Sequence, residues 1–249
     1  MSGHSKWATT KHRKGAKDSA RAKVFAKLIR QVEVAAREGG GDAATNAALR
    51  TTYQKAREAS VPLDTIERAI KRGTGELDGV RYEAISYEGY GPSGVAVIVE
   101  TLSDNRNRTS AEIRHLFGKN GGAIAEPGAV SWQFERKGVV EVEGPLDEDQ
   151  LLEWIMEAGA ENYEANGKDY VVTTEPHDVA VVRDALESHG LKVKSVDLTL
   201  VAQNTIPISD ESDVKKVLRL MDAIDDHDDV QNVYANFDIS DDLLASYEG

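Results

Sequence analysis

Apolar residues recur at every third or fourth position in the first third of the chain, and this spacing predicts helices. The longest such stripe lies between Ser19 and Glu38 and comprises Val24, Phe25, Leu28, Ile29, Val32, Ala35 and Ala36. A second helix is expected after Asp42, up to about Ser60. A third is expected from Asp64, with Gly73 as its stop, and Asp42 and Asp64 are the expected N-caps. Residues 1–78 therefore read as a helical domain with an amino-terminal arm.

Beyond residue 80 the pattern changes to strands and helices. Segment 138–202 reads strand, helix, strand, strand, helix, strand, which is the ferredoxin-like order. The flanking residues give this order again, with strands expected near 95–100, 123–125, 130–134 and 229–236 and helices at 110–119 and 211–224.

These patterns predict an α+β fold: an amino-terminal helical domain followed by two ferredoxin-like domains, one inserted in the other. The outer domain is expected at 79–135 plus 203–240, the inserted domain at 136–202 and a tail at 241–249. A single larger α+β domain is the alternative.

Charge is distributed unevenly along this acidic chain. Its formal net charge is −13, yet the first thirty residues contain nine Lys/Arg and one Asp. Residues 1–72 contain sixteen Lys/Arg and seven Asp/Glu, a net of +9, which leaves −22 for residues 73–249. Because an acidic protein is repelled by a polyanion, positive charge concentrated at one end predicts a surface that faces phosphates. The predicted partner is a nucleic acid. The alternative is that these basic residues bind nothing and are solvated on the exposed faces of helices.

The candidate nucleic-acid ligands are the basic residues of the arm and helices, the Trp and one His of the arm, and two arginines from the loop 103–109. They are Lys6, Trp7, Lys11, His12, Arg13, Lys14, Arg21, Lys23, Lys27, Arg30, Arg50, Arg57, Arg68, Lys71, Arg72, Arg106 and Arg108.

Several of these candidates have a structural alternative. Trp7 can instead cover the helical core. Lys71 and Arg72 can serve the helix dipole in a last turn. Arg106 and Arg108 can lie in solvent beside a turn made by Asp and Asn.

Motifs for catalysis or cofactor binding are not found in the sequence. Cysteine is absent, His4 and His12 have no further ligand at metal spacing, and no Walker-type loop occurs. The tract Asp225-Asp226-His227-Asp228-Asp229 lacks the spacing of a calcium loop and is expected to be a solvated loop. We expect no enzyme activity, no metal, no cofactor and no small-molecule substrate.

The chain has no apolar run of membrane-spanning length and no apolar segment near its start. We therefore expect a cytoplasmic protein without a membrane partner.

Several motifs resemble the bacterial YebC/PmpR family, to which the mitochondrial translational activator of cytochrome c oxidase also belongs. The resemblance rests on the stretches at residues 1–7, 11–14, 35–42, 64–73, 87–92, 104–109 and 228–234, and thus on nearly the whole chain. Positions 8–10, Ala-Thr-Thr, depart modestly from the pattern.

The resemblance implies a non-enzymatic three-domain protein that acts in gene expression. Two roles are known in the family: a DNA-binding transcriptional regulator, and a ribosome-associated factor that binds ribosomal RNA and relieves stalling, for example at proline runs. A basic arm that carries Trp is somewhat better suited to binding RNA than to reading the major groove of duplex DNA. A protein-binding adaptor that uses the acidic α+β domains is a third hypothesis.

The arm cations generate a first prediction. Replacing Lys11, Arg13 and Lys14 by Ala should flatten the salt dependence of nucleic-acid binding, by about 0.7–0.9 in log–log slope for each phosphate that the arm no longer neutralises. Titrating a labelled oligonucleotide at several salt concentrations measures the slope. An unchanged slope would show that these side chains remain in water.

Overall fold

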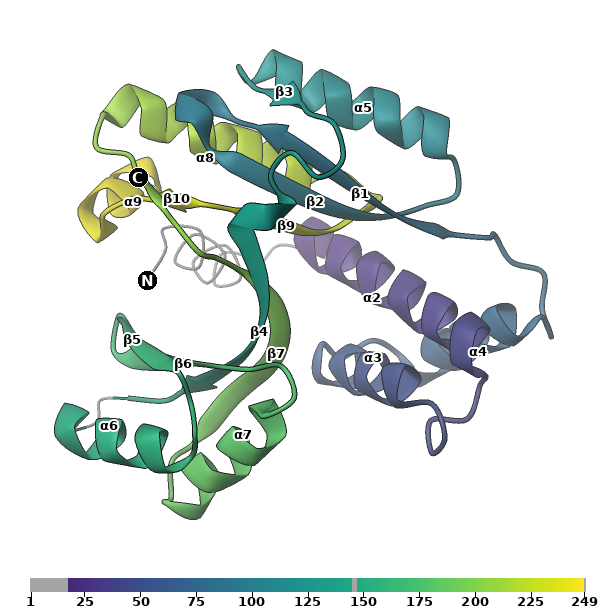
Figure 1. Cartoon of the computed structure of the whole chain (residues 1–249). Helices are drawn as coiled ribbons and strands as arrows, with labels where there is room; N and C mark the ends of the chain where they lie inside the picture. The colour runs from purple at the N-terminus through teal and green to yellow at the C-terminus, as the bar shows by residue number, and fades with distance from the viewer. Residues whose placement is uncertain (1–17, 145–146, 249) are drawn as a thin grey trace. The chain divides into compact units, whose positions relative to one another are not determined.

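The computed structural model describes residues 18–144 and 147–248 of the chain. Within these ranges the chain forms two compact units, whose elements are labelled in Figure 1. The first unit comprises residues 18–129 and 210–233, and the second comprises residues 130–144, 147–209 and 234–248. The expected α+β architecture is confirmed, while the exact domain limits stay a prediction.

Helices form the amino-terminal part of the first unit. They are α2 (Asp18–Gly39), α3 (Ala47–Glu58) and α4 (Leu63–Thr74). The carboxyl-terminal half of the predicted stripe forms the core, where Val32 and Ala36 pack with Leu49 and Ile66. Val24, at the start of the stripe, is 43% exposed, so the buried stripe is shorter than the sequence pattern.

The helix starts differ from the expected caps. The side chain of Asn46 accepts a hydrogen bond from the N–H of Leu49 at 3.0 Å, so Asn46 rather than Asp42 caps α3. The N-cap of α4 is Pro62, which places Asp64 inside the first turn. Asn46 is also tied to the end of α2, because its side-chain amide donates to the carbonyl of Ala35 at 2.8 Å.

Gly73 lies where α2 and α4 approach each other. A Cβ on Gly73 would lie 2.4 Å from the carbonyl oxygen of Glu33 and 2.7 Å from the Cβ of Ala36. The predicted stop at Gly73 is wrong, since α4 continues to Thr74 and Gly75 takes the left-handed conformation with φ 82°. Gly73 is required for the close approach of two backbones.

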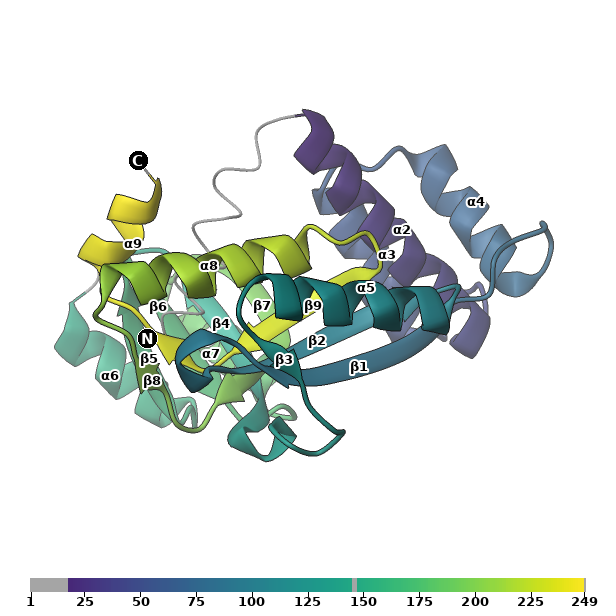
Figure 2. The same cartoon turned by 90° about the horizontal axis from the view of Figure 1, so that it is seen from above.

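A four-stranded sheet follows in the same unit, in the order β3-β1-β2-β9. Its strands are β1 (Glu83–Tyr90), β2 (Ala96–Ser103), β3 (Ala123–Ile124) and β9 (Val230–Ala235). The helices α5 (Arg106–Lys119) and α8 (Glu211–Asp225) lie next to each other over one face of this sheet (Figure 2). A short 3₁₀ turn, η1 (Pro92–Gly94), joins β1 to β2.

One predicted strand of this sheet is not formed. Residues 131–133 make a 3₁₀ turn, η2 (Ser131–Gln133), and Phe134 begins a strand of the second unit. The sheet position next to β2 is taken by β1, which pairs antiparallel with it throughout its length. Strands that follow each other across a short connection usually pair, and this local hairpin fills the position.

The second unit has a four-stranded sheet in the order β5-β6-β4-β7. Its strands are β4 (Phe134–Val142), β5 (Asn162–Asn166), β6 (Asp169–Thr174) and β7 (Val193–Ala202). The helices α6 (Glu148–Glu157) and α7 (Val179–Ser188) pack on one face (Figure 1), and Val140, Val172, Leu151 and Val182 form the core between them. This is the ferredoxin-like arrangement that the pattern of segment 138–202 predicted.

Short elements complete the second unit. They are β8 (Ile206–Pro207), β10 (Phe237–Asp238), which pairs parallel with it, and α9 (Asp241–Glu248).

Replacing Gly73 by Ala should lower the free energy of unfolding by about 2 kcal/mol, because the added methyl group forces two helix backbones apart. Gly118→Ala is the matched control, since Gly118 lies in α5 and a Cβ there would have no atom of the described residues within 4 Å. Urea unfolding of the two variants measures the difference. Equal stabilities would contradict the assigned role of Gly73.

Candidate nucleic-acid interface

The structure places the predicted nucleic-acid ligands in different surroundings. Lys6, Trp7, Lys11, His12, Arg13 and Lys14 lie outside the described residues. The other eleven candidates lie on α2, α3, α4 and α5 of the first unit.

Three cations of α2 meet the connection between α8 and β9. We call residues 225–229, which comprise the last residue of α8 and this connection, the acidic turn. Lys23 binds Asp226 at 3.3 Å, Lys27 binds Asp225 at 3.1 Å and Arg30 binds Asp229 at 2.9 Å. The prediction of a solvated loop is therefore wrong for Asp229, whose side chain is 3% exposed, and for the half-buried Asp225.

The same three cations also bind backbone oxygens, two at the end of α8 and one further along the acidic turn. Lys27 donates to the carbonyl of Asp225 at 3.0 Å, Lys23 to that of Asp226 at 3.2 Å, and Arg30 to that of Asp228 at 2.6 Å. The carboxyl end of a helix carries partial negative charge, and α8 has no basic residue in its last turn. Helix α2 thus supplies the positive charge that the end of α8 lacks.

Asp229 joins three elements of the first unit. Besides Arg30 from α2, its carboxylate accepts hydrogen bonds from Arg108 at 2.7 Å and Thr109 at 2.6 Å, both on α5. Burial opposes ionisation, but the hydrogen bonds from Thr109 and Arg108 and the charges of Arg108 and Arg30 outweigh it. The pKa of the Asp229 carboxyl is held below its ordinary value, so it is a buried anion with dedicated partners.

The two arginines of the loop 103–109 differ. Arg108 binds Asp104 at 2.8 Å in addition to Asp229, and Glu112 lies 3.8 Å away. Arg106 is exposed at the start of α5, whose N-cap is Asn105. The expected helix start at Ser110 is wrong, because α5 begins at Arg106 and Thr109 is buried one turn inside it. Of this pair, Arg106 is the one without a carboxylate contact among the described residues.

The remaining candidates divide into engaged and exposed cations. Arg72 binds the buried Glu33 at 2.8 Å, which holds α4 on α2, and Arg68 binds Asp64 at 2.6 Å on the helix surface. Arg21 lies over the ring of Phe25 at 5.4 Å.

Arg50, Arg57 and Lys71 are exposed, and within the described ranges none of them forms an ion pair with a carboxylate. They are the candidates of α3 and α4 that are most available to a phosphate.

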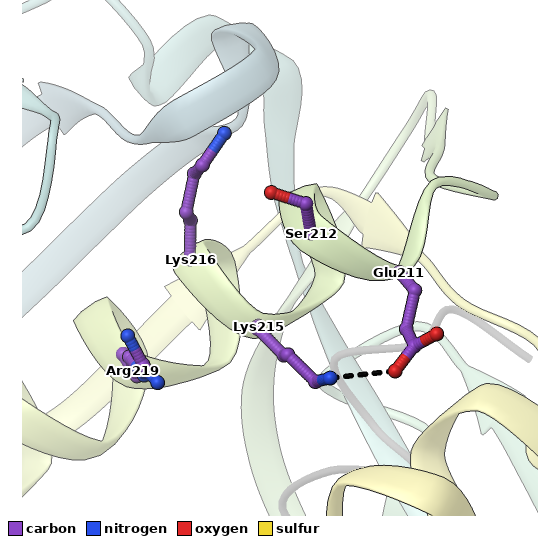
Figure 3. A pocket seen from close by; sticks show the side chains of 5 residues that line it. All are labelled: Glu211, Ser212, Lys215, Lys216 and Arg219. Atoms are coloured by element: carbon purple, nitrogen blue, oxygen red, sulfur yellow. Dashed lines mark hydrogen bonds and ion pairs between the residues drawn. The ribbon is translucent and has the colours of Figure 1, made fainter.

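A shallow hollow lies along the exposed side of α8 (Figure 3). It is lined by Glu211, Ser212, Lys215, Lys216 and Arg219. The first two cations are already neutralised, because Lys215 binds Glu211 at 2.5 Å and Lys216 binds Asp213 at 2.9 Å. An open hollow with this charge balance is not a preformed anion site.

Glu112, His227 and Asp229 are close enough to suggest a metal site, since their ligand atoms lie within 4.8 Å of one another. His227 accepts a hydrogen bond from the N–H of Asp229 at its Nδ1, so its Nε2 carries the proton and donates to Glu112 at 2.9 Å. Arg108 and Thr109 already occupy the Asp229 carboxylate. The group forms a hydrogen-bond chain and leaves no nitrogen lone pair for a cation.

The sequence interpretation missed the role of the acidic turn. A usable signal was present: Asp225 and Asp226 stand at the carboxyl end of a helix, where acids are unfavourable without nearby cations. Such a placement predicts a basic partner, but the pattern alone does not say that this partner is α2.

Comparisons with known proteins cover both units. A family model described as the TACO1/YebC protein N-terminal domain matches residues 5–76, and one described as the TACO1/YebC second and third domain matches residues 82–237. Within the described residues, no helix has the length and apolar character to cross a membrane.

Curated relatives are similar over their full length. A protein from Halothermothrix orenii is 53% identical over 247 residues, which cover 98% of both chains. One from Acidithiobacillus ferrooxidans is 51% identical over 248 residues, covering 100% of this chain and 99% of the relative. Both are named "Probable transcriptional regulatory protein".

A solved structure confirms the fold. The crystal structure of a conserved hypothetical protein from Aquifex aeolicus matches with a TM-score of 0.80 and 43% identity, covering 90% of this chain and 93% of that chain.

Replacing Asp229 by Asn should lower the free energy of unfolding by about 2 kcal/mol at pH 7, because the variant cannot form the hydrogen bonds to a buried charge. The stabilisation exists above the ordinary pKa of 3.8, and it disappears as the pH falls through the lower pKa of the folded state. The difference between wild type and variant should therefore shrink below about pH 4.

Asp228→Asn is the control, since Asp228 is exposed and should change stability by less than about 0.5 kcal/mol. Urea unfolding of all three proteins from pH 7 to pH 3 gives the comparison. A difference that stays constant down to pH 3 would assign the loss to packing rather than to the charge.

Proposed function

This chain belongs to the TACO1/YebC family, and we propose that it is a non-enzymatic, nucleic-acid-binding regulator of gene expression, of the DNA-binding transcriptional type. The names of its relatives support a regulatory role at the level of the family. The observation that carries nucleic-acid binding is the concentration of sixteen Lys/Arg against seven Asp/Glu in residues 1–72 of a chain with net charge −13.

The exposed cations of the helical part support this assignment. Arg50 and Arg57 lie seven residues apart on α3, and Lys71 lies in the last turn of α4. They are exposed and have no carboxylate partner among residues 18–144 and 147–248, so their charge is available, which is the electrostatic requirement for contact with a phosphate backbone.

The helices of this part do not favour a reader of the major groove. Helices α3 and α4 are joined by a short connection, as in a helix-turn-helix, but α4 carries Asp64 and Glu67 near its amino end. In a helix-turn-helix, the first residues of the second helix face the bases between two phosphate backbones. Carboxylates at these positions are repelled there, so we infer that contacts to the backbone dominate binding.

Binding to ribosomal RNA as part of the translation machinery is the alternative. Contacts to a phosphate backbone are compatible with either nucleic acid. Comparing the affinities for RNA and for duplex DNA therefore distinguishes the two roles.

The direct test measures binding of the full chain to a labelled duplex DNA and to a single-stranded RNA of the same sequence, at several salt concentrations. Arg57→Gln with Lys71→Gln should weaken binding about threefold to tenfold at low salt. The log–log salt slope should fall by roughly 1.4–1.8, because two phosphates are no longer neutralised by the protein.

Arg136→Gln with Lys168→Gln is the matched control, because it removes two exposed cations of the second unit. Affinity and slope should stay near those of the wild type. If both pairs weaken binding equally, binding follows net charge and the helical part is not the interface; if the wild type binds neither probe, the proposed function is wrong.

A further inference from the structure

The cations of α2 that meet the acidic turn form one continuous face. Lys23, Lys27 and Arg30 stand at positions i, i+4 and i+7, which places them along one side of the helix over about 10 Å. All three are predicted ligands of the nucleic acid. In this structure that face is occupied by the chain itself.

The acidic turn offers these cations the contacts that a phosphate backbone would offer. Each cation donates hydrogen bonds to one carboxylate oxygen and one backbone carbonyl oxygen, at distances between 2.6 and 3.3 Å. A phosphodiester likewise presents anionic oxygen to Lys and Arg through charge-assisted hydrogen bonds. The turn and a nucleic acid therefore require the same donor groups on α2.

The contacts become progressively more buried from Lys23 to Arg30. The pair at Lys23 is the most open, with side chains 45% and 66% exposed, and the pair at Lys27 is 18% and 25% exposed. At Arg30 the values are 20% and 3%. Because an exposed ion pair contributes little, a competing polyanion can displace Asp226 from Lys23 at small cost, whereas displacing the half-buried Asp225 from Lys27 costs more.

Asp229 does not depend on α2 alone. If Arg30 moves to a phosphate, the Asp229 carboxylate keeps its hydrogen bonds from Arg108 and Thr109 on α5. Release of the helix face therefore leaves no unpaired buried charge, which would otherwise oppose it strongly.

We propose that the acidic turn is an intramolecular competitor of nucleic acid for the Lys23–Lys27–Arg30 face of α2, so that binding requires its displacement. This inference rests on the proposed function and adds a mode of regulation to it. In the unbound chain the face is closed, and in the bound chain phosphates replace the carboxylates of Asp225 and Asp226.

The test uses the full chain with Asp225→Asn and Asp226→Asn, and leaves the buried Asp229 in place. Removing acids from the carboxyl end of α8 relieves an unfavourable interaction with the helix dipole, so the variant should fold. It should bind a labelled single-stranded RNA, or the duplex DNA of the same sequence, about threefold to tenfold more tightly than the wild type, because the two carboxylates no longer compete with phosphates for Lys23 and Lys27.

A matched control separates competition from net charge. Glu83→Gln with Glu126→Gln removes two exposed carboxylates from the same unit, and within the described residues neither pairs with a cation. Its affinity should change by less than about twofold, because neither carboxylate is paired with a cation of α2 and its removal therefore frees no phosphate ligand. If the affinity of both double variants for the probe rises equally, the acidic turn is not a competitor. The same holds if the wild type binds and neither variant binds more tightly, and in both cases the proposed function stands.

A second experiment links the acidic turn covalently to α2, so that it cannot be displaced. The chain has no cysteine, so Lys23→Cys with Asp226→Cys provides two unique sites for a short bis-maleimide linker. The linked protein should bind the RNA probe at least about threefold more weakly than the same variant capped with N-ethylmaleimide. Equal binding by the linked and capped forms would overturn the proposal, and failure of the wild type and both forms to bind would overturn the proposed function as well.

Discussion

The buried carboxylate of Asp229 is the interaction on which the first unit depends. An ionised group at 3% exposure is stable only with hydrogen-bonded partners, and these come from Arg30 on α2 and from Arg108 and Thr109 on α5. The carbonyl of Asp229 also accepts the N–H of Leu102 at the end of β2. One residue directly before β9 thus ties the helical part to the sheet and its covering helix.

This constraint changes the meaning of the charge asymmetry. The sequence presents a basic end and an acidic remainder, as if they were separate modules with separate partners. In the structure, the basic end and the acidic remainder partly neutralise each other. The acidic turn pairs with three cations of α2, and α2 supplies the positive charge that the end of α8 lacks. The second unit follows the same rule, because buried Asp169 pairs with Lys194 at 2.8 Å, and Lys137 is held by Glu161 and Glu175. The cations that stay available to an external anion, such as Arg57 and Lys71, are fewer than composition implies.

Much of the fold follows from local pattern, while the site depends on contacts distant in sequence. The 3.6-residue period gave α2 to within a residue at each end, and the order of elements in segment 138–202 gave the ferredoxin-like sheet. The cap of α3 was misassigned because Asp42 and Asn46 are equally good capping residues by type, and a contact of Asn46 with the end of α2 distinguishes them. The cap of α4 was misassigned because α4 begins one residue before Asp64. Arg30 and Asp229 are about two hundred residues apart, and no periodicity links them. Gly73 likewise looked like a helix stop, because a close approach of two backbones leaves no local signature.

The central claim is that the helical part, with α2 at its centre, contacts nucleic acid. Ultraviolet crosslinking in cells, followed by identification of both the crosslinked peptides and the attached nucleic acid, tests it most directly. The account predicts crosslinks within residues 1–72, including the face of α2 that carries Lys23 and Lys27, and the attached sequence distinguishes promoter DNA from ribosomal RNA. Crosslinks confined to residues 130–209, or no enrichment of nucleic acid over a control protein, would contradict it.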